Sequence, residues 1–175
     1  MLAALFAVSL GGLLWWMLHP PAPVSREVAK ARRSIDAVKR ILVPTVGMPY
    51  SERGVELACR LGMEQKAEII LVYVLEVPRT IPLGTPLPDS EARAQESIAR
   101  AQAVVKLHGL SATVHIERAR EVVEGIIRVA KDYDADLIVL GIRPRVSATE
   151  DILGRTSDAL LRRAPCEVIV DKLPG

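Results

Sequence analysis

The sequence is poor in the residue types on which nucleic-acid and metal sites depend. Of its 175 residues, six are aromatic, two are cysteine and three are histidine. All the Phe and Trp residues fall within the first sixteen positions, and the three tyrosines that remain are too few for a base-stacking platform. Cys59 and Cys166 cannot form a disulfide framework or a zinc site, and no histidine has ligand spacing to a cysteine or carboxylate. We therefore expect no metal site.

The small net charge of +2 is unevenly distributed along the chain. Residues 26–40 contain six Lys or Arg and two acidic residues, a net charge of +4, so the remainder carries −2. A slightly acidic folded part argues against a nucleic-acid-binding face, and we expect no nucleic-acid partner.

Motifs for catalysis are also missing. The chain has no Gly-Lys pair, hence no Walker sequence, and no G-x-G-x-x-G. Ser157 and the adjacent Asp158 are better explained as helix-start residues than as catalytic groups. The carboxylates of Glu117, Glu121 and Glu124 are interpreted as a solvated surface. We expect no catalytic residues and no enzymatic activity.

The first nineteen residues predict a transmembrane helix. Leu2 to Leu18 is uncharged and would form a helix of about 25 Å, near the short end for a hydrocarbon core of about 30 Å. Trp15 and Trp16 lie at the end of this stretch, as is typical of tryptophans at the level of the lipid headgroups. Prolines from Pro20 onward stop the helix.

Two interpretations of this segment compete. A cleaved signal peptide has a basic N-terminal region and a cleavage site of small residues, and neither is present here. An uncleaved anchor fits better, and its basic C-terminal flank predicts a cytoplasmic domain. The initial Met1 favours a complete single-pass chain over a fragment of a larger membrane protein. The predicted organisation is a transmembrane helix (1–19), a basic juxtamembrane linker (20–38) and a folded domain (39–172).

Within the folded domain, strand and helix patterns alternate, and Gly62 and Gly109 are interpreted as helix stops. Four prolines make residues 78–88 a loop, and residues 111–118 read as a half-exposed edge strand. This order predicts an α/β fold, an open parallel sheet with helices on both faces. The predicted strands are 41–45, 67–75, 111–118, 137–140 and 166–170, and the helices are 51–61, 90–108, 120–133 and 156–163.

Open parallel sheets bind ligands beyond the carboxyl ends of their strands, at the point where the strand order reverses. Here that prediction selects the loops Thr45–Tyr50 and Gly141–Gly154. A helix start after Gly154 offers amides to a phosphate, and glycines permit close approach. The alternative, that both glycines only make turns, is left open by the spacing.

Three stretches make the resemblance specific: KRILVPTVG in the first strand, ADLIVLGIR in the fourth, and ILGRTSDALLRRAPCEVIV through the last helix and strand. With them, Lys39 to Asp171 resembles a universal stress protein domain. The resemblance implies a five-stranded parallel sheet, and many members bind ATP or another adenine nucleotide. Their motif is G-x2-G-x9-G-(S/T), with an Asp two residues after the first-strand proline.

This chain departs from the motif at three positions. Gly141 and Gly154 match the first and last glycines, but Pro144 replaces the middle one. Arg155 replaces the hydroxyl residue, and Val46 replaces the Asp. The resemblance makes these the candidate ligand-binding residues: Pro44, Thr45, Val46, Val74 (a position that lines the adenine pocket in nucleotide-binding members), Gly141, Arg143, Gly154, Arg155, Thr156 and Ser157.

These replacements predict a degenerate nucleotide site. Pro144 removes a donor and Val46 an acceptor, whereas Arg143, Arg145 and Arg155 could still hold an anion by charge. No cofactor is certain; an adenine nucleotide or another anionic ligand is expected to bind weakly.

The expected function is that of a non-catalytic regulatory or accessory module on a membrane protein such as a transporter. The alternatives are an anchored adenine-nucleotide-binding stress protein and, less favoured, an ATP hydrolase. The last strand should lie at a sheet edge, where apolar strands invite pairing, and the resemblance implies a homodimer through it.

Overall fold

The computed structural model describes residues 9–11, 15, 38–143 and 154–172. The chain divides into two units, Met1–Ile35 and Asp36–Gly175, and the second contains all the strands and helices named below. Among the described residues no helix has the length and apolar character needed to cross a membrane. The predicted transmembrane segment 2–18 lies almost wholly outside the described residues, as does the linker 20–37.

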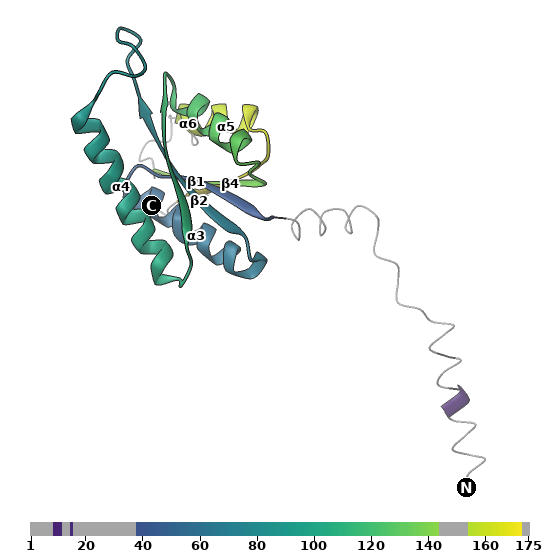
Figure 1. The fold of residues 1–175 in the computed structure, drawn as a ribbon. Helices are drawn as coiled ribbons and strands as arrows, with labels where there is room; N and C mark the ends of the chain where they lie inside the picture. The colour runs from purple at the N-terminus through teal and green to yellow at the C-terminus, as the bar shows by residue number, and fades with distance from the viewer. Residues whose placement is uncertain (1–8, 12–14, 16–37, 144–153, 173–175) are drawn as a thin grey trace. The chain divides into compact units, whose positions relative to one another are not determined.

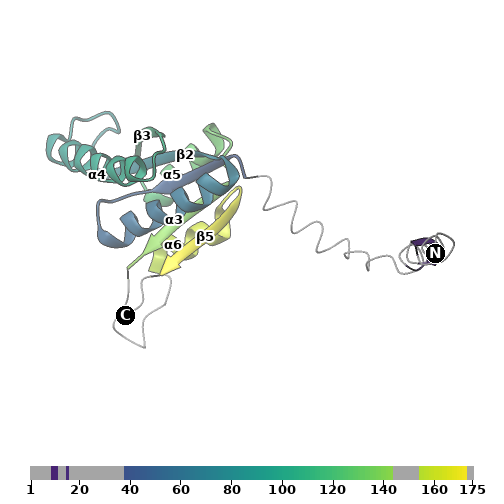
Figure 2. The same ribbon diagram turned by 90° about the horizontal axis from the view of Figure 1, so that it is seen from below.

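The second unit is the predicted α/β fold (Figure 1). Its described strands form one parallel sheet in the order β3-β2-β1-β4-β5, which confirms the five-stranded parallel sheet. Helices α3 and α4 cover one face of the sheet and α5 and α6 the other (Figures 1 and 2). The elements are β1 (Arg40–Pro44), α3 (Pro49–Gln65), β2 (Glu68–Glu76), α4 (Pro88–Leu107), β3 (Ala112–Ala119), α5 (Val122–Asp132), β4 (Leu137–Ile142), α6 (Gly154–Arg163) and β5 (Glu167–Lys172).

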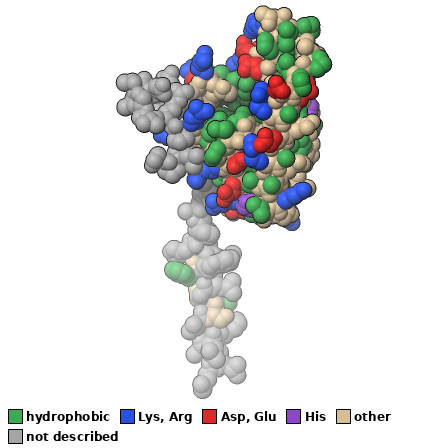
Figure 3. Space-filling view, turned by 90° about the vertical axis from the view of Figure 1, so that its left-hand side faces the viewer, with side chains coloured by type: hydrophobic (Ala, Val, Ile, Leu, Met, Phe, Trp, Pro, Cys, Tyr) green, Lys and Arg blue, Asp and Glu red, His purple; other side chains and the backbone are tan. Residues whose placement is uncertain are grey.

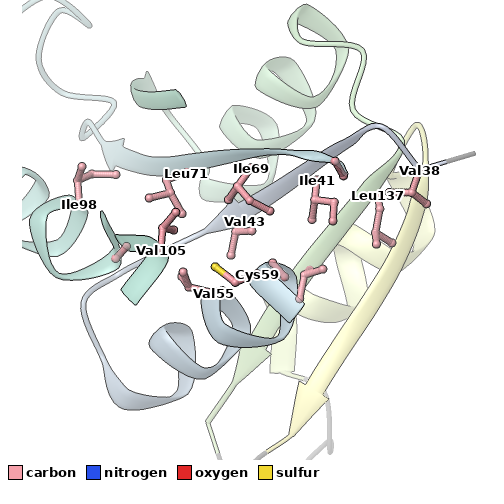
Figure 4. Packing of buried hydrophobic residues seen from close by; sticks show 14 residues of the cluster. Val38, Ile41, Val43, Val55, Cys59, Ile69, Leu71, Ile98, Val105 and Leu137 are labelled. Atoms are coloured by element: carbon pink, nitrogen blue, oxygen red, sulfur yellow. The ribbon is translucent and has the colours of Figure 1, made fainter. Parts of the chain in front are cut away.

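Two hydrophobic clusters fix the central strands, one on each face of the sheet. Because side chains alternate along a strand, Ile41 and Val43 of β1 pack under α3 and α4 (Figure 4), whereas Leu42 packs with the α5 and α6 cluster. β2 divides its residues in the same way, with Leu71 on the first face and Val72 on the second. Helices on both faces explain why these strands read as continuous apolar runs.

The edge strands follow the predictions as well. β3 is half-buried along most of its length, as its alternating pattern indicates. β5 forms the opposite edge, where Val168 and Val170 pack against the α5 and α6 cluster while Ile169 is 37% exposed. On the face that Figure 3 shows, acidic and basic side chains are interspersed over the described surface.

Asp136 fixes the place where the chain enters the sheet. Its carboxylate accepts hydrogen bonds from the backbone N–H groups of Lys39 (2.8 Å) and Arg40 (2.9 Å). The Arg40 guanidinium in turn donates to the carbonyl of Tyr133 at 2.8 Å. The start of β1 is therefore fastened to the residues just before β4, at the amino edge of the sheet.

The prediction that Gly62 ends its helix is wrong. α3 continues to Gln65, and Lys66, with a φ of 55°, closes it by donating its N–H to the Gly62 carbonyl. Gly62 instead provides space for β2, because a Cβ there would lie 2.8 Å from the Ile69 Cδ1 atom. Gly109, with a φ of 68°, follows the end of α4 as predicted.

Glycines also let α3 approach β4 very closely. A Cβ on Gly141 would lie 1.8 Å from the Tyr50 carbonyl oxygen, and one on Gly54 would lie 2.8 Å from the Gly141 nitrogen. Gly141 is therefore inside β4 and not in the loop that the sequence predicted, since β4 runs to Ile142. Its missing side chain makes room for the backbone of α3.

We predict that Gly141→Ala destabilises the domain by about 3 kcal/mol or more, because the new methyl meets the rigid backbone of α3 at Tyr50 and Ser51. Gly84→Ala is the matched control, since among the described residues nothing lies within 4 Å of a Cβ at Gly84. The control should change the free energy of unfolding by no more than about 0.5 kcal/mol. Urea unfolding of both variants measures the difference; equal stability would contradict the packing role of Gly141.

Candidate functional site

The candidate site lies at the carboxyl ends of β1 and β4. These strands are neighbours, but α3 leaves β1 over one face of the sheet while α6 follows β4 on the other. This is the reversal point at which open parallel sheets bind ligands, and the two loops that the sequence selected begin at the ends of these strands. The described parts of the candidate site are the loop Thr45–Met48, Arg143 and the first turn of α6; Pro144 and Arg145 lie outside the described residues.

The β1–α3 loop satisfies its own backbone donors. The Ser51 hydroxyl oxygen accepts from the N–H groups of Val46 (3.3 Å) and Met48 (3.1 Å), and donates to the Met48 carbonyl (2.8 Å). The Gly47 N–H points to the Thr45 hydroxyl at 3.5 Å. The Thr45 N–H donates to the Val72 carbonyl at 2.9 Å. Each backbone N–H from Thr45 to Met48 thus has an internal acceptor.

Buried hydroxyl groups hold this loop against α4. Thr45 and Ser97 are both buried, with their oxygens 3.4 Å apart. Gly47 adopts a φ of 68°, and a Cβ there would lie 2.4 Å from a guanidinium nitrogen of Arg100. The loop therefore needs glycine at this position for both its conformation and its contact with α4. Local sequence pattern does not single out Ser51 or Ser97; for Ser51 the available signal is a hydroxyl residue in the first turn of the helix, after Gly-Met-Pro.

The candidate residues of β1 and β2 differ in their access to the crevice. Pro44 and Thr45 are buried, whereas Val46 is 46% exposed. Val74 is half-buried beneath α5, since a Cβ on Gly125 would lie 2.6 Å from its Cγ1 atom. Val46 alone among these four presents a largely exposed side chain.

The candidate residues that follow β4 also differ in how exposed they are to solvent. Arg143 is exposed, with its guanidinium carbon 5.8 Å from the centre of the Tyr50 ring. Arg155 and Thr156 are exposed on the first turn of α6. Ser157 is buried, so its hydroxyl does not project freely into solvent. Gly154, which begins α6, has a φ of 68° and is half-buried.

A second group of residues holds the proline-containing loop between β2 and α4 in place by hydrogen bonds. The sequence pattern did not predict this group. This loop projects beyond the sheet in Figure 1. Arg118, near the end of β3, donates to the carbonyls of Leu83 (2.9 Å) and Thr85 and to the Glu91 carboxylate (2.8 Å). Arg120 donates to the Val77 carbonyl at 3.2 Å and to that of Pro78. Beside this loop, a hollow of about 500 Å³ is lined by Glu76, Val77, Pro78, Arg79, Arg120 and Glu121.

The prediction that the Glu117 carboxylate lies on a solvated surface is wrong. Its side chain is only 14% exposed. It lies 3.0 Å from His115 Nε2 and accepts a hydrogen bond from Arg128 of α5. The His115 ring also meets the edge of Tyr133, with centroids 5.8 Å apart. This network ties the β3 edge to α5 and leaves Glu117 with partners on two elements.

The cysteines are unsuited to nucleophilic chemistry. Burial raises the pKa of the Cys59 thiol to about 11, and burial together with Asp136 raises that of Cys166 to about 11. Both thiols therefore stay protonated near neutral pH. Cys59 is a core residue, and Cys166 packs half-buried against the α5 and α6 cluster. Within the described part of the chain, no group of three His, Cys, Asp or Glu is placed to hold a metal ion.

Comparison with known proteins agrees with the fold. The sequence profile of the universal stress protein family matches residues 37–172. The chain belongs to this family. A universal stress protein of Methanocaldococcus jannaschii is 26% identical over 152 residues, which cover 82% of this chain and 87% of the relative.

Solved structures show the same fold. A universal stress protein from Archaeoglobus fulgidus superposes with a TM-score of 0.64 at 20% identity, covering 76% of this chain and 97% of its own. Another structure from the same organism, a universal stress protein in complex with dAMP, has a TM-score of 0.61 at 17% identity and covers 76% and 96%. At these identities the likeness establishes the fold.

We predict that Arg118→Gln raises the pKa of Glu91. The hydrogen bond from the Leu87 N–H, followed by that from Arg118, holds this pKa below its ordinary value of 4.5. The ionised Glu91 therefore contributes stability that is present above 4.5 and is lost as the pH falls through the lowered pKa. An NMR titration of the Glu91 carboxyl should show its midpoint moving partway toward 4.5 in the variant.

Arg93→Gln is the control for this titration, because Arg93 hydrogen-bonds Ser90 on the same helix. It should leave the Glu91 midpoint in place. An unchanged midpoint in Arg118→Gln would show that the Leu87 N–H acts alone.

Proposed function

We propose that this protein is a membrane-anchored universal stress protein domain that acts as a non-catalytic regulatory or accessory module on a membrane protein such as a transporter. Its nucleotide site is degenerate. The observation that carries the proposal is the β1–α3 loop, in which Ser51 and Thr45 accept the backbone N–H groups of Val46, Gly47 and Met48.

The side chains around the crevice support a loss of nucleotide affinity. Val46, exposed in the loop, offers no carboxylate to a sugar or base. Pro144 and Arg155 replace the middle glycine and the hydroxyl residue of the motif. Each lost hydrogen bond to a charged group costs roughly 1.5–3 kcal/mol. Two or three such losses move a micromolar site toward millimolar, because about 1.4 kcal/mol corresponds to a tenfold change in Kd.

Charge at the crevice supports weak binding of an anion in place of tight nucleotide binding. Arg143 and Arg155 are both exposed at the carboxyl edge of the sheet. The first turn of α6 adds its N–H groups and its partial positive charge.

The anchor is proposed from the sequence. The uncharged stretch Leu2–Leu18 is followed by the basic residues 26–40, which favours a cytoplasmic domain under the positive-inside rule. A domain held at a membrane meets membrane proteins at high local concentration, which suits an accessory role. Self-association through β5, an edge strand with Ile169 exposed, is proposed alongside.

A second candidate is an anchored adenine-nucleotide-binding stress protein. The solved relative in complex with dAMP favours it, since that protein shares the fold. The two candidates differ in one measurable property, the affinity of the domain for ATP.

Isothermal titration calorimetry of the domain with ATP should give weak or undetectable binding. The triple change Val46→Asp, Pro144→Gly, Arg155→Ser should restore it, because it returns a carboxylate, a backbone donor and a hydroxyl to the motif positions. Met63→Asp is the matched control: Met63 is 45% exposed, as Val46 is 46% exposed, but lies on α3 away from the crevice. Micromolar binding by the unmodified domain would support the second candidate instead.

Fractionation of cells tests the anchor and the partner together. The full-length protein should sediment with membranes and resist high salt, and deletion of residues 1–23 should release it. After purification in mild detergent, mass spectrometry should detect a stoichiometric membrane protein. The mass of the released domain should fall from dimer to monomer in Ile169→Lys, because a charge on the exposed β5 edge opposes pairing.

Three outcomes would count against these assignments. A full-length protein in the soluble fraction, or one cleaved after residue 18, would contradict the proposed anchor. Purification without a membrane protein would contradict the proposed accessory role. A released domain that is already monomeric at micromolar concentration would contradict the proposed dimer through β5.

A further inference from the structure

A hollow of about 500 Å³ opens where β2 and β3 end. The described residues that line it are Glu76, Val77, Pro78, Arg79, Arg120 and Glu121. Its volume lies within the range of roughly 300–1,000 Å³ that is typical of small-molecule sites. None of the described candidate residues for a nucleotide is among them, so the hollow is a second place where a ligand could bind.

Hydrogen bonds fix the two walls of the hollow to each other. Glu76 of β2 lies in register with Ala119 of β3, and beyond them β2 leads into the loop to α4 and β3 leads into α5. The Val77 N–H donates to the Ala119 carbonyl at 2.9 Å. The Arg120 guanidinium donates to the Val77 carbonyl at 3.2 Å and to the Pro78 carbonyl. A ligand therefore enters a shape that exists before it binds, which lowers the entropic cost of binding.

One carboxylate in the hollow has no cation beside it. Glu76 is exposed at the end of β2, and among the described residues no Lys, Arg or His lies within ion-pair distance of its oxygens. The other carboxylate, that of Glu121, already accepts a hydrogen bond from Arg79 at 2.9 Å. Glu76 is therefore the acceptor that the hollow offers to an ammonium group.

Arg120 supplies the opposite charge in a fixed orientation. Its side chain is half-buried, and its Nη1 group donates to the two carbonyls of the loop after β2. Because a guanidinium is planar, these bonds orient the whole group. Its Nε and Nη2 groups have no acceptor within the described part of the chain. They are left to pair with a carboxylate in a two-pronged geometry.

This combination of charges selects the class of ligand. A simple anion would be repelled by the two carboxylates of the hollow, and a simple cation by its two guanidiniums. Glu76 and Arg120 do not pair with each other, so each charge is available to a partner of its own. A small molecule that carries one ammonium group and one carboxylate satisfies both.

We infer that the hollow at the ends of β2 and β3 binds a free α-amino acid, its ammonium group on Glu76 and its carboxylate on Arg120. The side chain of the amino acid lies against Pro78, the exposed apolar residue of the lining. The inference goes beyond the proposed function, because it assigns a second ligand site that uses no described residue of the nucleotide motif.

Equilibrium dialysis of the full-length protein in detergent with radiolabelled L-leucine tests the inference. Three unlabelled competitors separate the contributions: isocaproate is leucine without its ammonium group, isoamylamine is leucine without its carboxylate, and ATP addresses the nucleotide motif. Unlabelled leucine should displace the label at a concentration at least about tenfold lower than either analogue, since each analogue loses one charged hydrogen bond. ATP should not displace the label.

Glu76→Gln tests the position of the ammonium group. It should weaken leucine binding about tenfold, to the level of isocaproate, and should not weaken the binding of isocaproate itself. Because Glu76 makes no hydrogen bond or ion pair with a described residue, the variant should fold as the unmodified protein does. Glu64→Gln is the matched control: it removes an exposed carboxylate from the last turn of α3, outside the described lining, and should leave leucine binding unchanged.

Arg120→Gln tests the position of the carboxylate and should also weaken leucine binding about tenfold. This variant releases the loop after β2 as well, so Arg118→Gln is its control. Arg118 holds the same loop through the carbonyls of Leu83 and Thr85 but is not among the lining residues. Arg118→Gln should leave leucine binding unchanged.

Each contrary result overturns the inference. Equal displacement by isocaproate would show a plain anion site, and equal displacement by isoamylamine a plain cation site. Equal losses in Arg120→Gln and Arg118→Gln would show that binding depends only on the loop. Displacement by ATP would place leucine at the nucleotide motif. Absence of leucine binding overturns the inference and leaves the proposed function standing, because the nucleotide site and the anchor are tested separately.

Discussion

The backbone contact between α3 and β4 is the constraint on which the candidate site depends. With glycine at positions 54 and 141, the first turns of α3 lie directly on the sheet, and the Tyr50 carbonyl covers Gly141. This approach fixes the direction in which the chain leaves β1, and so the short loop that carries Val46 and Met48. It also places the Tyr50 ring under the guanidinium of Arg143. A side chain at Gly141 would separate the two walls of the crevice, and the site would lose its geometry before any ligand was considered.

The family fold favours a ligand at the carboxyl ends of β1 and β4, whereas the hydrogen bonds of this chain satisfy the loop donors there internally. The strand order reverses between β1 and β4, where open parallel sheets bind ligands, and solved structures with this fold include one in complex with dAMP. In this chain the β1 wall is closed by hydroxyl groups of its own, from Ser51 and Thr45. Specificity in such a fold is thus set by a few side chains at the strand ends, because the core that builds the crevice is independent of them.

Periodicity and proline placement predicted the sheet and its edges, since apolar runs such as Ile69–Val72 arise from burial on both faces. They failed where a residue's role depends on contacts distant in sequence. Gly62 reads as a helix stop because glycine often ends helices, but here β2 packs against it. Gly141 reads as part of a motif, yet its lack of a side chain serves α3. Ser51 and Glu117 have ordinary local patterns, and only the folded chain gives their hydrogen bonds.

The anchoring of Lys39 and Arg40 by Asp136 has a mechanical consequence. Any tension on the N-terminal segment reaches the domain at the first residue of β1, a central strand paired on both sides with parallel neighbours. A pull along that strand loads many backbone hydrogen bonds simultaneously, in shear, and cannot open them one after another from an edge. Resistance to such a pull is governed by the rate of unfolding. A domain that the chain enters through its middle strand therefore resists unfolding when its N-terminal end is pulled along that strand.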